Sequence, residues 1–346
     1  MSLYVDYLCS RELNMEKVLI KRTIPLALLV LILSACSQSG NGKDKIAGLS
    51  LSTQKERYLL DVEFIAKMPR IPGQSHHKQV QNLCAKRFNE LGFDVEFHDY
   101  GTGINVIGVY PGKQNPTEKI LVSAHYDTVP DCHGADDNAS GIAGVFETAR
   151  LLVSKEHDRS LVVACWDEEE RETIGSKAYV KREKNNAADI KMSYVYEMIA
   201  YRNNQPDSQQ IPAGFERLYP QQVKRIRSNQ NKGDFIALIY DDKASEMLST
   251  ITEHAQRQNL SVLQFEVSSQ LKTSPLAVDL RRSDHSAFWD EDYPAMMITD
   301  TANFRNQHYH CLNGEDNVED LDAEFAIKII NTLSKTIEES LGKSTK

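Results

Sequence analysis

Short runs of almost wholly apolar residues recur along the chain and alternate with longer amphipathic segments. The runs occupy residues 120–124, 161–166, 193–196, 235–240, 262–267 and 295–298. Strands that are apolar on both sides are typical of a parallel sheet whose two faces are both covered. The segments 141–153 and 243–258 have the apolar periodicity of helices. We therefore predict a single α/β domain of three layers, with helices on both faces of a central mixed, largely parallel sheet.

Further elements are predicted on either side of this core. They are helices over 55–68, 77–91 and 323–341, and a hairpin of strands over 93–97 and 105–110. The long polar stretch 202–233 predicts an excursion over one edge of the domain, and long ordered loops often line active sites. The histidines predicted to face solvent are His76, His77, His98 and His157.

The N-terminal segment has the pattern of a signal peptide. Lys17, Lys21 and Arg22 precede an apolar run over 24–33, and small residues follow it. The run is too short to span a bilayer of about 30 Å, so we predict a signal peptide over residues 1–35. If Met15 is the true start, residues 1–14 are an artefact of start choice. A buried core helix is the competing interpretation, and the abrupt change to polar residues after this segment disfavours it.

The segment Leu33-Ser34-Ala35-Cys36 resembles the lipobox of bacterial lipoproteins. The resemblance implies that Cys36 is lipidated, that residues 36–50 form a flexible tether and that residues 51–346 form the working domain. Acyl chains hold a protein at a membrane because each buried CH₂ contributes about 0.8 kcal/mol. Ser37, in place of an aspartate, implies a place in the bacterial cell envelope, on the outer membrane facing the periplasm.

The net charge of the chain argues against one class of binding partner. Lys and Arg total 40 and Asp and Glu total 49, so the net charge is -9. A nucleic-acid-binding protein needs basic residues that displace counterions from phosphate, so the composition argues against a nucleic-acid partner. Hydrophobic residues make up 41% of the chain, which excludes wholesale disorder.

Polar side chains follow four of the predicted strands at their carboxyl ends. They are His125-Tyr126-Asp127, Asp167-Glu168-Glu169-Glu170, Glu197 and the loop with His308-Tyr309-His310. The carboxyl edge of an open α/β sheet is where ligands bind. Acidic groups gathered there repel one another unless a cation lies between them. Imidazole and carboxylate ligands without cysteine suit Zn²⁺, and two ions that share a carboxylate would use such a set.

Together, these motifs resemble those of the dizinc aminopeptidases related to aminopeptidase S and aminopeptidase Y. The matching blocks, within residues 55–340, are His125-Tyr126-Asp127, Gly134-Ala135-Asp136-Asp137-Asn138-Ala139-Ser140-Gly141, Glu169-Glu170 with Gly175-Ser176, Glu197-Met198-Ile199-Ala200-Tyr201 and Tyr309-His310. The resemblance implies the zinc-peptidase, or phosphorylase/hydrolase-like, form of the fold and two Zn²⁺ ions per chain. The metal ligands that it implies are His125 and Glu197 on one zinc, Glu170 and His310 on the other, and Asp137 as the bridge.

The same resemblance assigns roles to neighbouring residues. Asp127 would accept a hydrogen bond from the first histidine ligand and fix its ring. Glu169 would be the general base, and Tyr309 would donate to the developing oxyanion. Asp284 and His285 belong to a block that is placed near the substrate pocket.

The chain departs from the family pattern at two places. Glu172-Thr173 stands where the family usually has Gly-Leu, and Glu197 stands where it commonly has Asp. The run Glu168-Glu169-Glu170 allows more than one alignment, and Gly175-Ser176 is the anchor that selects the second and third glutamates.

The cysteines give a further expectation. Cys84 and Cys165 lie in apolar-periodic segments and are predicted to be core residues. Cys132 and Cys311 each follow a loop of the site, and in an exported protein they could form a disulfide or stay free.

The sequence thus predicts a membrane-anchored zinc aminopeptidase, with residues 51–346 as its catalytic domain. It would use a metal-activated water to cleave the N-terminal peptide bond of small peptides with a free N-terminus. The alternatives are a glutaminyl cyclase, which by resemblance uses one zinc, and a non-catalytic surface binding protein on the same fold. A carboxypeptidase would need a cation for the substrate carboxylate, for which Arg202 or Arg305 is available. The candidates for an apolar subsite are Phe215, Tyr219, Phe288 and Trp289.

Overall fold

The computed structural model describes residues 42–342, apart from the side chains of residues 42–53 and of Leu276. The predicted signal peptide over 1–35 and the predicted lipidation site Cys36 lie outside the described residues. Among the helices of the described part, none has both the length and the apolarity that crossing a bilayer requires.

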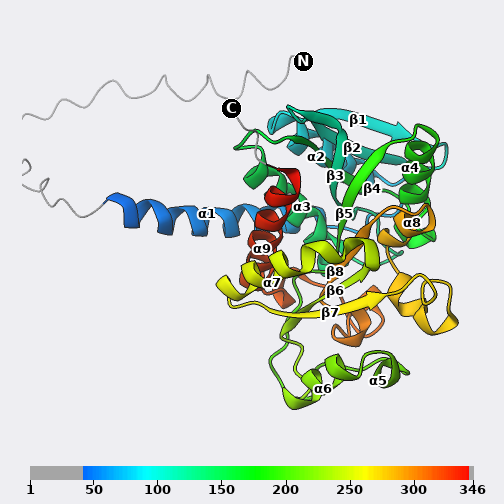
Figure 1. Cartoon of the computed structure of the whole chain (residues 1–346). Helices are drawn as coiled ribbons and strands as arrows, with labels where there is room; N and C mark the ends of the chain where they lie inside the picture. Colours follow the sequence, from blue (N-terminus) through cyan, green and yellow to red (C-terminus); the bar gives the residue numbers. More distant parts are fainter. Residues whose placement is uncertain (1–41, 343–346) are drawn as a thin grey trace, which may run out of the picture. The chain divides into compact units, whose positions relative to one another are not determined.

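Eight strands form one sheet in the order β1-β2-β4-β3-β5-β8-β6-β7 (Figure 1). Their bounds are β1 Asp94–Asp99, β2 Ile104–Tyr110, β3 Asn115–His125, β4 Arg159–Trp166, β5 Asp189–Glu197, β6 Phe235–Asp241, β7 Ser261–Val267 and β8 Ala295–Thr299. The pairs β3–β4, β3–β5, β5–β8 and β6–β7 are parallel, and the pairs β1–β2, β2–β4 and β6–β8 are antiparallel. Every predicted strand is present, and the prediction of a mixed, largely parallel sheet is confirmed.

The apolar runs exist because both faces of the sheet are buried. Along β4, Val163 and Cys165 join one hydrophobic cluster, whereas Val162, Ala164 and Trp166 join another on the opposite face. Successive side chains of a strand point to opposite faces, so a strand between two layers needs apolar residues at every position. The predicted three layers are therefore confirmed.

Helices form the two outer layers (Figure 1). One face is covered by the end of α1 (Gly42–Ile65) and by α2 (Ser75–Glu90), α3 (Gly141–Leu152), α7 (Leu248–Arg257) and α9 (Ala323–Leu341). The other face is covered by α4 (Ile174–Asn185), α6 (Pro220–Ser228) and α8 (His285–Asp290). In α9, apolar residues at four-residue intervals are buried, and the Asp322 side chain caps the first turn by accepting from the Phe325 amide at 3.0 Å.

The segment before the domain differs from its prediction. Helix α1 begins at Gly42, so it includes residues 42–50, which were assigned to a flexible tether over 36–50. No proline lies between Gly42 and Pro69, so nothing in the covalent backbone stops the helix from extending ahead of its apolar pattern. The compact unit begins at Leu49, close to the predicted domain boundary at residue 51.

Four parallel strands end at one edge of the sheet and deliver the polar residues there. His125 ends β3, Asp167 follows β4, Glu197 ends β5 and Thr299 ends β8. Because these strands run side by side in the same direction, residues up to about 170 positions apart meet at that edge.

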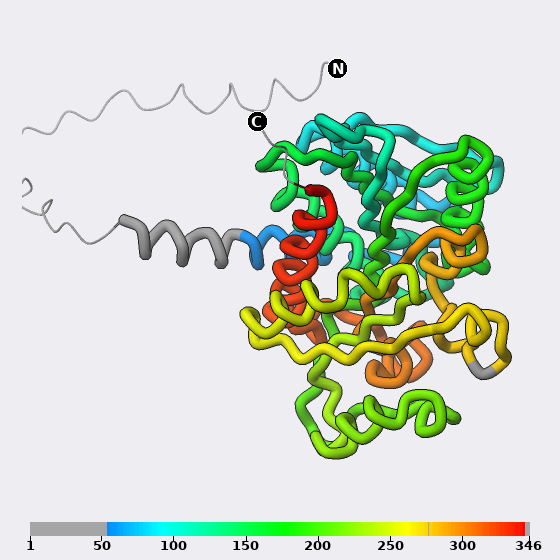
Figure 2. Tube along the Cα trace, viewed as in Figure 1, coloured from blue at the N-terminus to red at the C-terminus, as the bar shows by residue number. Residues whose placement is uncertain are grey.

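The predicted excursion over 202–233 is also present. Asn203 and Gly233 form an isolated antiparallel bridge, so the stretch leaves and rejoins the domain at one point. It contains α5 (Phe215–Leu218) and α6, and Figure 2 shows it in yellow-green beyond β7. The Tyr219 hydroxyl donates to the Glu266 carbonyl of β7 at 2.8 Å, which ties the excursion to that edge.

Candidate active site

Asp137 lies between the two histidines that the sequence predicts as ligands. Its Oδ1 atom is 3.2 Å from His125 Nε2, and its Oδ2 atom is 3.4 Å from His310 Nε2. Glu197 Oε2 is 3.5 Å from the same His125 nitrogen, and Glu170 Oε2 is 3.1 Å from the His310 nitrogen. The structure therefore brings together the complete predicted ligand set, with Asp137 in the bridging position.

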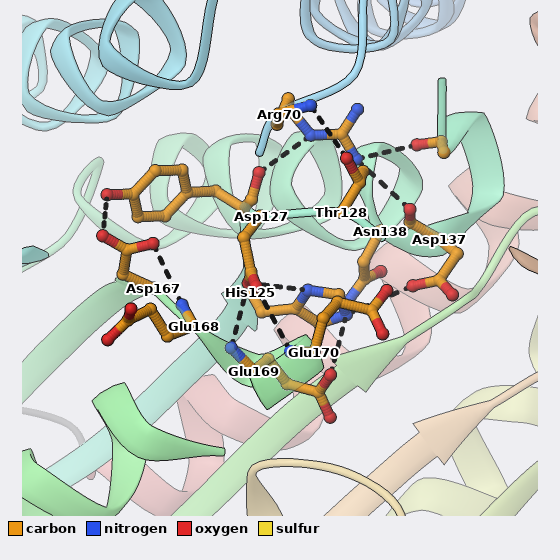
Figure 3. A network of polar contacts seen from close by, with 12 residues as sticks. Arg70, His125, Asp127, Thr128, Asp137, Asn138, Asp167, Glu168, Glu169 and Glu170 are labelled. Atoms are coloured by element: carbon orange, nitrogen blue, oxygen red, sulfur yellow. Dashed lines mark hydrogen bonds and ion pairs between the residues drawn. The ribbon is translucent and has the colours of Figure 1, made fainter. Parts of the chain in front are cut away.

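Two distant segments hold the backbone around Asp137. The amides of Asp136 and Asp137 donate to Asp316 Oδ2 at 2.9 and 3.0 Å. The guanidinium of Arg70 donates to the carbonyl oxygens of Gly134 and Asp137 at 2.9 and 3.2 Å (Figure 3). Arg70 is fully buried, and burial lowers its pKa to about 10 although the nearby carboxylates favour its charge. The buried guanidinium of Arg70 and the carboxylate of Asp316 thus fix the backbone around Asp137.

Asp127 organises the turn that carries Glu169 and Glu170. Its Oδ1 atom accepts from the Glu169 amide at 3.0 Å, and its Oδ2 atom accepts from the Glu170 amide at 3.2 Å (Figure 3). The same Oδ1 atom lies 3.4 Å from His125 Nδ1. This placement fits the predicted role beside His125 and adds a second one, because the carboxylate also fixes both glutamates.

Glu169 lies just outside the bridged set. Its Oε2 atom is 3.9 Å from His125 Nε2, farther than the nearest oxygen of Asp137. Burial raises the pKa of Glu169 well above its ordinary value, and the charge of Glu197 adds to this effect while His125 opposes it. A carboxyl group within reach of the ligand atoms is placed to accept and return a proton.

The donor set is suited to a cation. Both ring nitrogens of His125 and the Oε1 atom of Glu170 are buried and have no hydrogen bond of acceptable geometry. Buried polar atoms without hydrogen bonds are rare, and a metal ion would satisfy these atoms at once. Among the described residues, the groups whose ligand atoms lie close enough to hold an ion are His125 with Glu169 and Glu197, and Asp137 with Glu170 and His310.

The pKa values of the candidate ligands are shifted because their ionisable groups are buried close to one another. Burial alone would raise the pKa of Asp137, but contacts with His125 and His310 outweigh it and hold that pKa below its usual range. Burial raises the pKa of Glu170 to about 7. Burial opposes the charge on His125, yet the negative charges of Glu169 and Glu197 raise its pKa well above the ordinary value. These opposed charges and raised pKa values are those of a donor set whose carboxylates a cation would stabilise.

A short segment before α8 completes the side of the site near Glu197. The Ser283 hydroxyl donates to Glu197 Oε2 at 2.7 Å, and both groups are buried. Asp284 is fully buried as well, and burial raises its pKa to about 7 in the field of His125 and Glu197. Asp284 thus belongs to the buried ionisable groups around His125 and Glu197, which we call the charged cluster, and not to a pocket wall.

Tyr309 and a disulfide flank the His310 ligand. The Tyr309 ring stacks on the His310 ring with centroids 3.8 Å apart and 21° between the planes. Cys132 and Cys311 form a disulfide with Cα atoms 5.5 Å apart. The bridge joins the loop after β3 to the residue next to His310, so the open question of these two cysteines is answered. Cys84 and Cys165 are free and buried, as predicted.

A cavity opens beside Glu197 and Tyr309. Its wall includes Gln209, Gln210, Ile211, Pro212, Phe215 and Ile226 of the excursion, together with Phe235, Ala237, Ile239, Phe265, Met297 and Phe304. Acidic and phenolic groups stand at one end, and the remaining wall is mainly apolar. The 202–233 stretch therefore contributes to the wall of this cavity.

Several candidates from the sequence lie elsewhere. His285 is fully buried, donates from Nε2 to the Leu280 carbonyl at 2.9 Å and packs edge-on against Trp289, which corrects its assignment to the substrate pocket. Phe215 lines the cavity, whereas Tyr219, Phe288 and Trp289 are buried without lining it. The physical reason is helical geometry, because the short helix α8 turns its aromatic face toward the sheet.

Neither of the cations considered for a carboxypeptidase lines the cavity. Arg202 pairs with Asp322 at 2.7 Å, and Arg305 is buried with its guanidinium 4.6 Å from the Phe235 ring centroid. The prediction that His77 faces solvent is wrong. His77 is buried and donates to Asp167 Oδ1 at 2.7 Å.

His76 and His157 are buried as well, and each contacts a backbone carbonyl, so the prediction of solvent exposure is wrong for them too.

Sequence reasoning missed Arg70, Arg282 and Asp316, which hold parts of the site. Arg282 directly precedes the block Ser283-Asp284-His285, and this adjacency was the available signal. Arg70 and Asp316 lie outside helices and strands in segments with no periodic pattern, so no signal distinguished them from surface charges.

The fold and the site define a class. A zinc-type donor set of imidazoles and carboxylates, gathered at the carboxyl edge of an α/β sheet, is that of a metallopeptidase. The chain belongs to peptidase family M28, whose pattern matches residues 105–337.

Known proteins resemble the chain in sequence or in fold. The uncharacterized protein YfbL of Escherichia coli K12 is 31% identical over 223 residues, which cover 60% of this chain and 62% of YfbL. The chain thus spans less than two thirds of that relative's length. Two solved structures share the fold: BSAP, a zinc aminopeptidase from Bacillus subtilis, and a Porphyromonas gingivalis glutaminyl cyclase.

The first of these structures has a TM-score of 0.61 at 13% identity, covering 84% of this chain and 96% of that one. The second has a TM-score of 0.58 at 16% identity, covering 83% and 98%. At such identities the likeness shows the fold alone.

Proposed function

We propose that this chain is a zinc aminopeptidase that removes apolar residues from the N-terminus of peptides. The observation that carries the proposal is the position of Asp137 between His125 and His310, with Glu169 close by but outside the bridged set. The proposed ligands are His125, Asp137 and Glu197 for one zinc ion, and Asp137, Glu170 and His310 for a second. Zinc, when bound, supplies a Lewis acid and lowers the pKa of a water molecule.

The protein groups around the ligands would move the protons. Glu169 takes a proton from the attacking water and returns it to the leaving amine, for which its raised pKa is suited. The Tyr309 hydroxyl donates to the substrate carbonyl oxygen as negative charge develops there. These two roles need groups on either side of the scissile bond; Tyr309 lines the cavity next to His310, and Glu169 Oε2 lies 3.9 Å from His125 Nε2.

The cavity explains cleavage at the first residue. The carboxylates of Glu197 and Glu169 attract the free α-ammonium of a peptide, while the cavity beyond accepts the first side chain. A wall that includes Phe215, Phe265 and Met297 favours an apolar side chain, since each buried CH₂ contributes about 0.8 kcal/mol. The substrate class is therefore peptides with a free N-terminus and an apolar first residue.

The deciding experiment replaces Glu169 with Gln and measures zinc content and leucyl-anilide hydrolysis together. The amide keeps the shape but does not carry the proton, so we expect zinc to be retained and kcat to fall by about 10² to 10⁴-fold. Glu168→Gln is the matched control, because Glu168 accepts from Thr102 and Arg171 and lies outside the ligand set. Unchanged turnover in Glu169→Gln would contradict the proposal.

A glutaminyl cyclase remains the rival that shares the fold. Conversion of a glutaminyl peptide to its pyroglutamyl form, without anilide hydrolysis, would replace the aminopeptidase proposal.

We also propose that Cys36 carries a lipid anchor that holds the domain on the outer membrane, facing the periplasm. The disulfide between Cys132 and Cys311 supports an oxidising compartment, because such bridges are rare in the cytosol. Cys36→Ala would then move the protein from the membrane fraction to the soluble fraction. Unchanged membrane association would contradict the anchor.

A further inference from the structure

Arg282 contacts Tyr309 at the mouth of the cavity. Its Nη2 atom donates to the Tyr309 hydroxyl oxygen at 3.0 Å, and its Nη1 atom donates to Asn303 Oδ1 at 2.9 Å. The guanidinium carbon lies 5.4 Å from the Tyr309 ring centroid. Since the same ring stacks on His310, the phenol contacts both a cation and a proposed metal ligand.

The hydrogen bond from Arg282 decides where the phenol proton points. A hydroxyl group has one proton, and an arginine only donates, so the Tyr309 oxygen is the acceptor in this contact. The hydroxyl proton is then directed away from Arg282. Among the described residues, no acceptor receives a hydrogen bond from this hydroxyl. Its proton is therefore available to a substrate oxygen in the cavity.

The positive charge of Arg282 lies beside the phenol, since its guanidinium carbon is 5.4 Å from the Tyr309 ring centroid. A hydrogen-bond donor that is aimed at a developing negative charge stabilises that charge. Among the described residues that line the cavity, Arg282 is the one with a positive charge, so no neighbour replaces it.

We propose that Arg282 is a positioning residue for Tyr309: its guanidinium holds the phenol oxygen so that the hydroxyl proton faces the carbonyl oxygen of the substrate. This inference rests on the proposed aminopeptidase function. It differs from recognition of a substrate carboxylate by Arg282, which would act on binding rather than on turnover.

A double-mutant cycle on the full chain tests the inference. The variants are Arg282→Met, Tyr309→Phe and the two combined, with leucyl-anilide as substrate because it has no carboxylate. We expect Tyr309→Phe to lower kcat by about 10²-fold. Arg282→Met lowers kcat by roughly 10-fold with KM within about two-fold, since the contact acts in the transition state.

The combined variant separates action through Tyr309 from independent action. We expect it to match Tyr309→Phe alone, because Arg282 has nothing to position once the hydroxyl is absent. Arg282→Lys restores part of kcat by supplying a charged donor. A combined variant whose loss equals the product of the two single losses would overturn the proposal, as would an effect of Arg282→Met confined to KM.

Arg281→Met is the matched control. Arg281 is the adjacent arginine, but it pairs with Asp290 and lies outside the cavity lining. We expect its kcat to equal that of the unchanged chain, and zinc content and thermal unfolding are followed in every variant. A loss in this control as large as in Arg282→Met would overturn the proposal.

A readout without turnover distinguishes this inference from the proposed function. With tyrosines labelled at Cζ with ¹³C, Tyr309→Phe identifies the Tyr309 resonance. We expect that resonance to shift in Arg282→Met and to stay in Arg281→Met, even if the substrate class is different. No shift in Arg282→Met overturns the positioning role, whereas a shift in a chain that does not hydrolyse the anilide overturns only the proposed function.

Discussion

The Ser283 hydroxyl donates a hydrogen bond of 2.7 Å to Glu197 Oε2 in the buried floor of the site. Glu197 ends β5, and Ser283 comes from the loop before α8, so the contact joins two segments separated by 86 positions. Glutamate is longer than the aspartate expected at this position. The serine restricts that added freedom by holding Oε2, the same carboxylate oxygen that lies 3.5 Å from His125 Nε2.

Ser283→Ala tests this restraint. Loss of a hydrogen bond to a ligand carboxylate commonly lowers metal affinity by about 10- to 100-fold, and we expect zinc affinity to fall within that range. Competition with a chromophoric chelator gives the affinity. Ser286→Ala is the control, because Ser286 donates to the Ser283 backbone carbonyl instead. Equal affinities for Ser283→Ala and the unchanged chain would show that Glu197 needs no restraint.

Asp127→Asn removes one hydrogen-bond acceptor from the turn that carries Glu169 and Glu170. An amide has one acceptor oxygen, so either the Glu169 or the Glu170 amide loses its partner and faces an N–H group. We expect zinc content and kcat to fall together, each by at least about ten-fold. Elemental analysis and anilide hydrolysis on one preparation measure both. A decrease in kcat with full zinc content would assign Asp127 to catalysis alone.

Filling the cavity tests substrate preference. Ala237 lines the cavity from β6, and Ala237→Leu would occupy part of the space for the first side chain. We expect the ratio of kcat/KM for leucyl- over alanyl-anilide to fall by about ten-fold or more, because a hydrophobic pocket discriminates on the scale of single methylene groups. The alanyl substrate is the internal control. An unchanged ratio would place the first side chain elsewhere.

Zinc uptake by the metal-free chain should strengthen as pH rises. Burial disfavours the charge on His310, but its contacts with Asp137 and Glu170 outweigh burial and raise its pKa to about 10. Burial raises the pKa of Glu170 to about 7. A metal binds neutral imidazole and ionised carboxylate, so uptake at pH 6 must displace more protons than uptake at pH 8.

Affinity is therefore higher at pH 8 than at pH 6. Calorimetry in two buffers of different ionisation enthalpy counts the protons released. Uptake without proton release at pH 6 would contradict the assignment of His310 and Glu170 as ligands.

The disulfide should matter for both stability and metal binding. It closes a loop of 179 residues between Cys132 and Cys311, so its loss is expected to lower the free energy of unfolding by about 2 to 4 kcal/mol. Because Cys311 follows His310, the double serine variant should also bind less zinc. Chemical unfolding and zinc analysis check the two effects. Dithiothreitol should leave the double variant unchanged, and a similar stability in all forms would contradict the bridge.

Much of the fold could be predicted from local patterns. Apolar runs such as 161–166 predicted strands because a strand between two helical layers is buried on both faces, and that requirement is visible in a few consecutive residues. The ligand set was implied by the family resemblance, and two of its members were placed at the sheet edge for a related reason. His125 and Glu197 are the last residues of their strands, so strand periodicity placed them at one edge without any knowledge of side-chain packing.

Other assignments failed where packing decided the outcome. His77 has no sequence feature that separates it from an exposed histidine, yet α2 turns it toward Asp167. His285 follows Asp284 directly, but one belongs to the charged cluster and the other packs against Trp289. Neighbours in a short helix point in different directions, and only the surrounding elements determine which direction meets the site.

The sequence by itself determined the class of fold, the order of its elements and the acids and imidazoles that reach the carboxyl edge. These properties depend on hydrophobic periodicity and on the residues directly after each strand, and both are local features of the chain. Only the tertiary structure decided which oxygen of Asp137 faces which histidine, that Cys132 pairs with Cys311, and that Arg282 and Ser283 hold Tyr309 and Glu197. Such contacts join residues far apart in the chain, and they form because the packed layers leave each side chain one position in which its charge or hydrogen bonds are satisfied.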